Sequence, residues 1–156
     1  MVRHRRVLAI IPARGGSKGI RFKNLVEING KSLIEIVGDF VKKSEQLDYS
    51  VVSTDNSDIK KAALDVGLEV PFDRPKELAG DIVSDVDVLS HALLETEKLT
   101  GLTYDIVVML QPTSPFRQPE HLTDVLDYLT ENECDSVLTV SETDSVAQPA
   151  RHSTAR

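Results

Sequence analysis

Four short, continuous apolar runs constrain the fold of this chain more than any other feature of its sequence. They lie at 7–11, 49–53, 105–110 and 136–140, and turn-forming residues flank them. Continuous apolar runs of this length are typical of strands that are covered on both faces of a parallel sheet. We therefore expect these four segments to be the central strands of one sheet.

Between the apolar runs, apolar residues recur at the spacing of amphipathic helices. These helical patterns cover 33–41, 59–66, 86–94 and 122–129. Strands and helices therefore alternate along the chain. This alternation predicts an α/β fold, a three-layer α/β/α sandwich around a Rossmann-like, mainly parallel sheet.

Turn-forming residues mark the ends of several of these segments. Gly67 follows the second helical pattern as an expected C-cap, and Pro119 suits the first turn of the fourth helix. Asn29-Gly30 predicts a tight turn after a short strand at 25–28. A further short extended piece is expected at 69–72.

The chain length fits a single α/β domain, which we expect to cover 1–140 of the 156 residues. The remaining segment, 141–156, is polar and contains almost nothing to bury. We expect this tail to be disordered, or to be the start of a C-terminal part that this sequence lacks.

The charge balance argues against nucleic acid and membranes as partners. The chain has 25 acidic and 18 basic residues, a formal net charge of -7, whereas such partners are held by extended basic surfaces. No apolar stretch approaches the roughly 20 residues that span a bilayer. The basic residues before 7–11 resemble the start of a signal peptide, but the apolar run is short and leads into a charged loop. Cys134 is the only cysteine, which excludes an intramolecular disulfide and predicts a reducing, cytoplasmic location.

The positive charge is concentrated near the start of the chain, where the apolar run at 7–11 opens into a glycine-rich loop at 12–24. Seven basic residues precede the first acidic one: Arg3, Arg5, Arg6, Arg14, Lys18, Arg21 and Lys23. Glycines permit unusual backbone angles and close approach, so main-chain N–H groups can point at phosphate oxygens. The glycines expected to act in this way are Gly15, Gly16 and Gly19. Arg14, Lys18 and Lys23 would supply positive charge to the same phosphates.

This loop predicts a triphosphate site of a less common kind. It lacks the Gly-x-x-x-x-Gly-Lys-Ser/Thr pattern of a P-loop, and it lacks Gly-x-Gly-x-x-Gly. Kinase and dehydrogenase functions are therefore disfavoured. On composition alone the alternative is a surface loop with solvated charges, but the position directly after a predicted buried strand favours phosphate binding.

Polar residues also follow two other predicted strands. In an open parallel sheet, ligands bind outside the carboxyl ends of the strands. Thr54-Asp55 follows 49–53 and either contacts a ligand or caps the next helix. Gln111-Pro112-Thr113 follows 105–110, where a glutamine can donate to and accept from a hydroxylated ligand. Turn formation around the prolines is the alternative for this second loop.

Four further residues are candidates with an ordinary structural alternative. Arg74 could reach phosphate or ribose, or could be a solvated loop arginine. Asp81, Asp85 and Asp87 could suggest a metal, but acids before and within the first turn of a helix already gain from the helix dipole, and we favour that interpretation. The four histidines show no metal-ligand spacing, so no residue is assigned as a metal ligand.

Four groups of motifs together resemble those of the acylneuraminate cytidylyltransferases, or CMP-N-acetylneuraminic acid synthetases. They are IPARGGSKGI at 11–20 with KNL at 23–25, STD at 53–55, RP at 74–75 with ELA at 77–79, and LQPTSP at 110–115. The resemblance covers most of residues 6–140. Sister enzymes that activate 3-deoxy-manno-octulosonate differ after the shared Pro-Ala-Arg and carry an acidic residue in place of Gln111-Pro112-Thr113.

The resemblance implies a fold of the nucleotide-diphospho-sugar transferase type and a role in lipopolysaccharide or capsule carbohydrate biosynthesis. It implies transfer of CMP from CTP to the anomeric hydroxyl of a nine-carbon 2-keto sugar acid, with release of pyrophosphate and help from Mg²⁺. By position, Arg14, Lys18 and Lys23 would be the catalytic cations, and Gln111 and Thr113 would contact the sugar acid. The residues implied to bind the nucleotide are Arg14, Gly15, Gly16, Ser17, Lys18, Lys23, Asn24, Arg74, Ser84 and Asp85.

Two departures from the family pattern bear on these expectations. Many members have paired serines near the cytosine where this chain has Ser84-Asp85, which puts one base contact in doubt. Members are usually longer, and the resemblance implies that the Mg²⁺ ligands and much of a homodimer contact lie in a C-terminal part absent here. A non-catalytic nucleotide-binding module and a nucleotidylyltransferase for a different sugar both stay open as alternatives.

Overall fold

The main sheet has three parallel strands, β1 (Val7–Pro12), β4 (Tyr49–Ser53) and β5 (Ile106–Met109), in the order β4-β1-β5. The computed structural model describes residues 5–16, 19–140 and 142. Ile10 in the central strand is paired with Val51 on one side and with Met109 on the other. Three of the four predicted strands are therefore confirmed.

Strand β1 is buried along nearly its whole length. The side chains from Leu8 to Ile11 have 0% of their surface exposed. A strand with a neighbour on each edge and helices over each face has no solvent-facing side, which explains its continuous apolar sequence. The core cluster contains Leu8, Ile10, Val51, Phe72 and Ala92.

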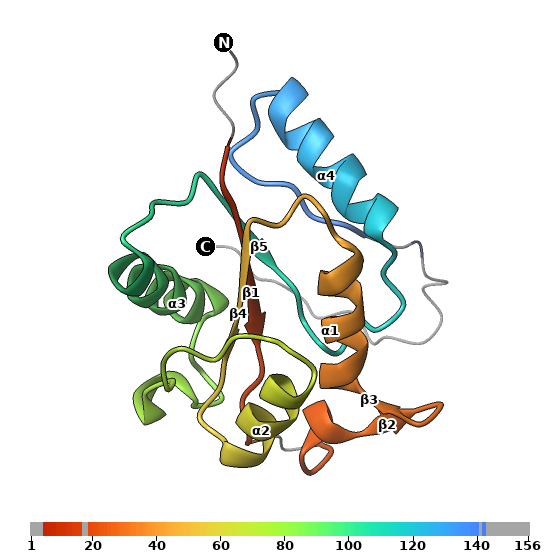
Figure 1. Ribbon diagram of the computed structural model, residues 1–156, viewed down its shortest axis with the longest axis vertical. Helices are drawn as coiled ribbons and strands as arrows, with labels where there is room; N and C mark the ends of the chain where they lie inside the picture. Colours follow the sequence, from red (N-terminus) through yellow and green to blue (C-terminus); the bar gives the residue numbers. More distant parts are fainter. Residues whose placement is uncertain (1–4, 17–18, 141, 143–156) are drawn as a thin grey trace, which may run out of the picture. The chain divides into compact units, whose positions relative to one another are not determined.

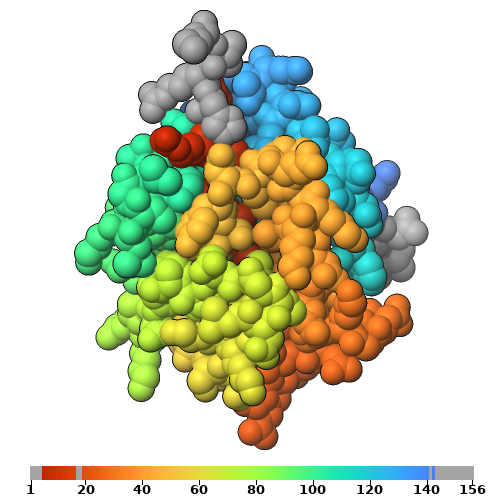
Figure 2. All heavy atoms as spheres, in the orientation of Figure 1, coloured from red at the N-terminus to blue at the C-terminus, as the bar shows by residue number. Residues whose placement is uncertain are grey.

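Helices cover both faces of this sheet. They are α1 (Leu33–Lys43), α2 (Ser57–Asp65) and α3 (Asp85–Thr100), of which α1 packs against α2, and α3 packs against β1 and β4. Figure 1 shows α3 on one side of the three strands and α1 on the other. Figure 2, in the same orientation, shows little of the red β1 at the surface of the molecule. The predicted three-layer α/β/α sandwich is confirmed.

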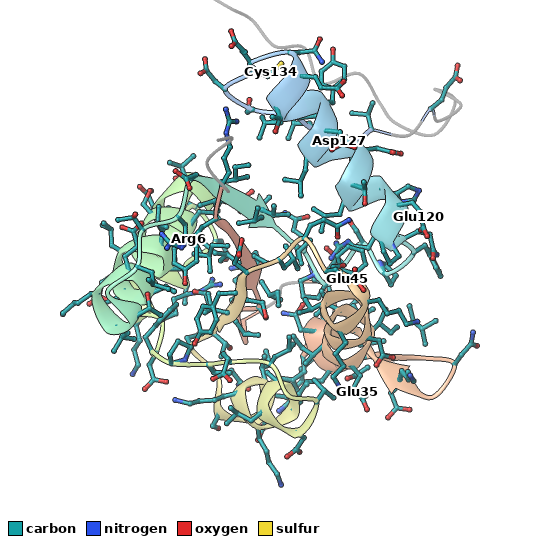
Figure 3. All side chains as sticks on the ribbon, turned by 45° about the horizontal axis from the view of Figure 1, so that its top comes forward. Arg6, Glu35, Glu45, Glu120, Asp127 and Cys134 are labelled. Carbon is teal, nitrogen blue, oxygen red and sulfur yellow. The ribbon has the colours of Figure 1, made fainter. Side chains whose placement is uncertain are left out.

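Capping side chains fix where the helices begin. Glu35, labelled in Figure 3, lies in the first turn of α1, and its backbone N–H donates to Ser32 Oγ at 3.3 Å. The Glu35 carboxylate in turn accepts a hydrogen bond from the Ser32 backbone N–H at 2.6 Å. This capping box satisfies two N–H groups that the helix itself leaves without a partner.

A short antiparallel hairpin precedes α1. It pairs β2 (Glu27–Ile28) with β3 (Lys31–Ser32), and its two turn residues, Asn29 and Gly30, have φ of 53° and 78°. Positive φ at both positions is what a two-residue hairpin turn requires, so the predicted turn is confirmed. The predicted strand at 25–28 is shorter than expected, because Leu25 belongs to the 3₁₀ helix η1 (Lys23–Leu25).

Two predicted helix boundaries are also confirmed. Gly67 follows α2 with φ of 78°, and Pro119 is the first residue of α4 (Pro119–Glu131). The extended piece expected at 69–72 is represented by a single bridge between Glu69 and Val51.

The predicted strand at 136–140 is wrong. The structure has no strand there, and Leu138 and Val140 are 83% and 91% exposed. A strand needs a neighbouring strand for its N–H and C=O groups, and in the described part of the chain this segment pairs with none. Apolar composition alone therefore did not suffice to predict a buried strand.

The chain divides into two compact units, 1–122 and 123–156. The second unit contains most of α4, including Asp127, and then Cys134, both labelled in Figure 3. Cys134 N donates to Leu129 O at 3.1 Å, which closes the end of the helix. Of the expected tail at 141–156, all but Glu142 lies outside the described residues. None of the helices in the described ranges is long and apolar enough to cross a membrane.

Candidate functional site

A cleft of about 310 Å³ opens at the carboxyl ends of the strands in the first unit. The segments that follow β1 and β5 contribute to its wall, together with the segment between α2 and α3 and the start of α3. Thr54 and Asp55, directly after β4, do not line it. The carboxyl ends of the strands are where an open parallel sheet binds ligands. The polar and charged residues that line it are Arg14, Lys23, Asn24, Arg74, Asp81, Asp85, Gln111 and Thr113. The structure therefore brings most of the predicted site residues to one place.

The loop after β1 is held close to the loop after β4. Gly15 N donates to Asp55 Oδ1 at 2.8 Å, and a Cβ on Gly15 would lie only 2.7 Å from Asn56 Cβ. The close approach of the two loops therefore requires glycine at position 15, because a side chain there would clash with Asn56. Gly16 lines the cleft with open space around it, and a Cβ on Gly19 would also meet nothing within 4 Å. No neighbouring protein atom thus requires glycine at these two positions, and their predicted close approach to phosphate stays a prediction.

Two predicted residues of the same loop, Ser17 and Lys18, lie outside the described residues. Their assigned roles in nucleotide binding stay predictions. Lys23, another of the three predicted cations of this loop, lies in η1 and lines the cleft.

Asn24 supports the backbone of the loop from inside. It is 6% exposed, and its Nδ2 donates to Arg14 O at 3.1 Å. The side chain also lines the cleft. Asn24 therefore holds the carbonyl of Arg14 in place, a structural task that the sequence motif did not reveal.

Arg14 crosses from this loop to the segment before α3. Its Nη1 lies 2.7 Å from Asp81 Oδ1 and 3.4 Å from Ala79 O. Both side chains of the ion pair are partly exposed, 35% for Arg14 and 41% for Asp81. Asp81 lies before α3, and its carboxylate pairs with the Arg14 guanidinium across the cleft.

Arg74 is a buried arginine, and the alternative of a solvated loop arginine is wrong. It is 5% exposed and lines the cleft. Its Nε donates to Ser53 Oγ at 3.0 Å and its Nη2 donates to Ser53 O at 2.7 Å. Burial lowers the pKa of Arg74 below its ordinary value, and the negative charge of Asp55 opposes this shift. The remaining guanidinium donors are held at the cleft by these two bonds.

Thr54 and Asp55 do not cap α2. The N-cap is Asn56, whose Oδ1 accepts hydrogen bonds from Asp58 N and Ile59 N, both at 3.0 Å. Thr54 is buried, with its Oγ1 accepting from Asn56 N at 3.2 Å. Because Asn56 caps the helix, the Asp55 carboxylate does not, and it accepts a hydrogen bond from Gly15 N in the loop after β1.

Ser84 and Asp85 begin α3 and differ in their relation to the cleft. Ser84 is the N-cap; its Oγ accepts from Asp87 N at 3.1 Å and donates to Asp87 Oδ2 at 2.7 Å. Asp85 and Asp87 lie in the first turn, as the helix-dipole interpretation predicts. Asp85 lines the cleft, whereas Ser84 is absent from its lining. The described residues contain no group of three or more His, Cys, Asp or Glu that could hold a metal ion.

The loop after β5 both lines the cleft and forms a turn, which are the two alternatives that its sequence left open. Gln111, Pro112 and Thr113 line the cleft, and Ser114 N donates to Gln111 O at 3.2 Å in a turn. The guanidinium of Arg117 donates to the same carbonyl and stacks on Phe40, 5.5 Å from its ring centroid. Burial lowers the pKa of Arg117. Arg117 was missed from the sequence, and its position two residues after the Gln-Pro-Thr-Ser-Pro loop was the signal available.

Comparison with solved structures identifies the fold. The CMP:2-keto-3-deoxy-manno-octonic acid synthetase complexed with CTP matches with a TM-score of 0.69 and 23% identity, over 82% of this chain and 48% of that chain. At this identity the likeness shows the fold alone. The chain therefore shares the Rossmann-like α/β fold of this synthetase.

Comparison of sequences identifies the family. The family described as Cytidylyltransferase matches residues 8–155, and the chain belongs to this family. It is 38% identical over 115 residues to the CMP-N,N'-diacetyllegionaminic acid synthase of Legionella pneumophila, covering 74% of this chain and 49% of that protein. It is 33% identical over 148 residues to the N-acylneuraminate cytidylyltransferase of Escherichia coli, covering 94% of this chain and 34% of that protein. The chain thus spans about half, or less, of the length of these curated relatives.

Proposed function

We propose that this chain provides the CTP site of an enzyme that transfers CMP from CTP to an N-acylneuraminate-like 2-keto sugar acid. One observation carries the proposal: Arg14, Lys23 and Arg74 line a single cleft at the carboxyl ends of parallel strands, together with Gln111. These three cations outnumber the two carboxylates of the cleft wall, Asp81 and Asp85, and the positive excess favours an anionic ligand. Membership of the cytidylyltransferase family supports CTP as that ligand.

In the proposed reaction the anomeric hydroxyl oxygen of the sugar acid attacks the α-phosphorus of CTP. The bond between the α-phosphorus and the oxygen that bridges to the β-phosphate breaks, pyrophosphate leaves, and the hydroxyl proton is released. Negative charge grows on the α-phosphate and on the departing pyrophosphate. Arg14, Lys23 and the predicted Lys18 would stabilise this charge, while the rigidly held Arg74 orients the nucleotide.

A divalent metal, Mg²⁺ in the proposal, would neutralise further phosphate charge when bound. The described residues do not by themselves fit such an ion, since no cluster of three carboxylate, imidazole or thiolate ligands is present among them. Of the two acids on the cleft wall, Asp81 and Asp85, Asp81 is paired with Arg14. No step above depends on the metal.

Gln111 and Thr113 are the residues we propose to contact the sugar acid. Their loop is fixed by Arg117 through the carbonyl of Gln111, so the Gln111 side chain has a supported backbone from which to bind hydroxyl or amide groups. The relatives named for N,N'-diacetyllegionaminic acid and N-acylneuraminate support a sugar acid of this chemical class. A cytoplasmic location completes the proposal.

The direct test measures pyrophosphate released from CTP by this chain with a panel of nonulosonic acids and Mg²⁺. The expected result is release that depends on one of these acids, and an Arg14→Ala variant that binds CTP about tenfold more weakly or worse. Arg21→Ala is the matched control, because Arg21 lies in the same loop but does not line the cleft. Equal CTP affinity in the Arg14 variant would refute the cleft as the nucleotide site.

A non-catalytic nucleotide-binding module is the second candidate, and the lack of a metal-ligand cluster in the described residues favours it. Calorimetry separates the two candidates. This alternative predicts CTP binding with no pyrophosphate release, even when sugar acid and Mg²⁺ are both present.

A further inference from the structure

The ion pair of Arg14 lies within the cleft and joins two different loops. Arg14 comes from the loop after β1, and Asp81 comes from the segment between the 3₁₀ helix η2 (Lys76–Leu78) and α3. Both residues line the cleft, and their charged atoms Nη1 and Oδ1 are 2.7 Å apart. A carboxylate therefore holds a guanidinium at the place where we propose that phosphate binds.

The backbone around Arg14 is held independently of this ion pair. Asn24 Nδ2 donates to Arg14 O, and Gly15 N donates to Asp55 Oδ1. Because the main chain is fixed on both sides, the guanidinium can change partner by rotation of its side chain alone. No loop needs to unfold for such a change.

The ion pair is also weak enough to be replaced. At 35% and 41% exposure, water and an entering ligand reach both side chains, and ion pairs with this exposure contribute little free energy. A phosphate group offers the guanidinium the same two-oxygen geometry as a carboxylate, with more negative charge. We therefore expect a phosphate group to displace the Asp81 carboxylate from the Arg14 guanidinium.

We infer that Asp81 is a positioning residue that holds the Arg14 guanidinium until a phosphate group of the ligand takes its place. Exchange of one anion for another favours ligands that carry phosphate, because an uncharged ligand offers the guanidinium no anion in place of Asp81. That the ligand is CTP rests on the proposed function. The exchange itself concerns phosphate, and it can be tested with inorganic pyrophosphate.

The test is calorimetric titration of pyrophosphate into the whole chain and its Asp81→Asn variant at constant ionic strength. Removing the competing carboxylate should tighten pyrophosphate binding about two- to fivefold. Glu77→Gln is the matched control, because Glu77 is an exposed acid in η2 and does not line the cleft. This control should leave pyrophosphate affinity unchanged, which separates the specific exchange from a general loss of negative charge.

The Arg14→Ala background provides the second arm. If Asp81 acts through Arg14, the double variant Arg14→Ala/Asp81→Asn should bind pyrophosphate no more tightly than Arg14→Ala alone. Weaker or unchanged binding by Asp81→Asn in the wild-type background would overturn the inference. An equal gain in the Arg14→Ala background would overturn it as well.

Failure of the inference is distinguishable from failure of the proposed function. If Asp81→Asn binds pyrophosphate more tightly but the chain does not bind CTP more tightly than pyrophosphate, the exchange is supported and the CTP site is refuted. Sugar-dependent pyrophosphate release from CTP, with Asp81→Asn no tighter than wild type for pyrophosphate, would support the function and refute the exchange.

Discussion

The guanidinium of Arg74 is fixed by Ser53, the last residue of β4, through both its side chain and its main chain. Nε donates to Ser53 Oγ at 3.0 Å and Nη2 donates to Ser53 O at 2.7 Å, while Arg74 N donates to Thr54 O at 2.9 Å. Ser53 is fully buried and Arg74 nearly so. The end of a core strand thus sets the position of a cation in the cleft.

Replacing Ser53 by alanine should lower both stability and ligand affinity. The substitution leaves the buried Nε of Arg74 without its acceptor, which costs about 1–3 kcal/mol of unfolding free energy. Urea denaturation measures this loss, and calorimetry should show weaker CTP binding. Ser50→Ala on the same strand is the control, since Ser50 is only half-buried. Equal effects of the two substitutions would contradict a specific role for Ser53.

A side chain at Gly15 should disrupt the contact between the loops after β1 and β4. The Cβ of Gly15→Ala would lie 2.7 Å from Asn56 Cβ, and Asn56 is the cap of α2 and has little freedom to move. We expect a loss of about 1–3 kcal/mol in the free energy of unfolding, as for other overpacked sites.

Gly16→Ala is the matched control for this substitution, because a Cβ there meets nothing within 4 Å. Chemical denaturation should find the Gly16 variant as stable as the wild type. A Gly15 variant of wild-type stability would show that the two loops separate without cost.

The sequence predicted those elements that depend on local patterns. The strand at 49–53 and the turn at Asn29-Gly30 are specified by residues adjacent in the chain, and both are confirmed. The segment at 136–140 has the same composition as a strand but lacks a neighbouring strand among the described residues. Local pattern contains no information on that neighbour, so the prediction failed there.

The contacts that shape the site were beyond such reasoning, because they join distant residues. Arg14 and Asp81 are 67 positions apart, and the sequence gives no reason to prefer Asp81 over Asp85 as the partner of Arg14. The buried state of Arg74 depends on Ser53, 21 positions earlier. The sequence therefore located the cleft-lining loops, whereas the ion pairs and hydrogen bonds between them required the three-dimensional structure.

Arg117 should be needed to hold the loop after β5. Arg117→Met keeps an apolar chain of similar length beside Phe40 but removes the donor to the Gln111 carbonyl. We expect faster amide hydrogen exchange in 111–115 and a raised KM for the sugar acid, with CTP affinity unchanged. Arg21→Met is the control, because Arg21 also stacks on an aromatic ring, that of Phe22 at 5.1 Å, outside the cleft lining. Unchanged exchange in the Arg117 variant would rule out this anchoring role.

The capping box of α1 should make stability depend on pH through Glu35. Hydrogen bonding to the side chain and the backbone N–H of Ser32 lowers the pKa of Glu35 in the folded chain. A lowered folded-state pKa gives stability that is present above the unfolded-state value of about 4.3 and is lost as pH falls through the folded-state value. Urea denaturation should therefore find Glu35→Ala less stable than wild type at pH 7, with the difference shrinking below about pH 4. Glu45→Ala, which removes an exposed acid just after α1, is the matched control and should leave the stability at pH 7 unchanged. A difference for Glu35→Ala that stays constant down to pH 2.5 would show that the carboxylate charge contributes nothing to the cap.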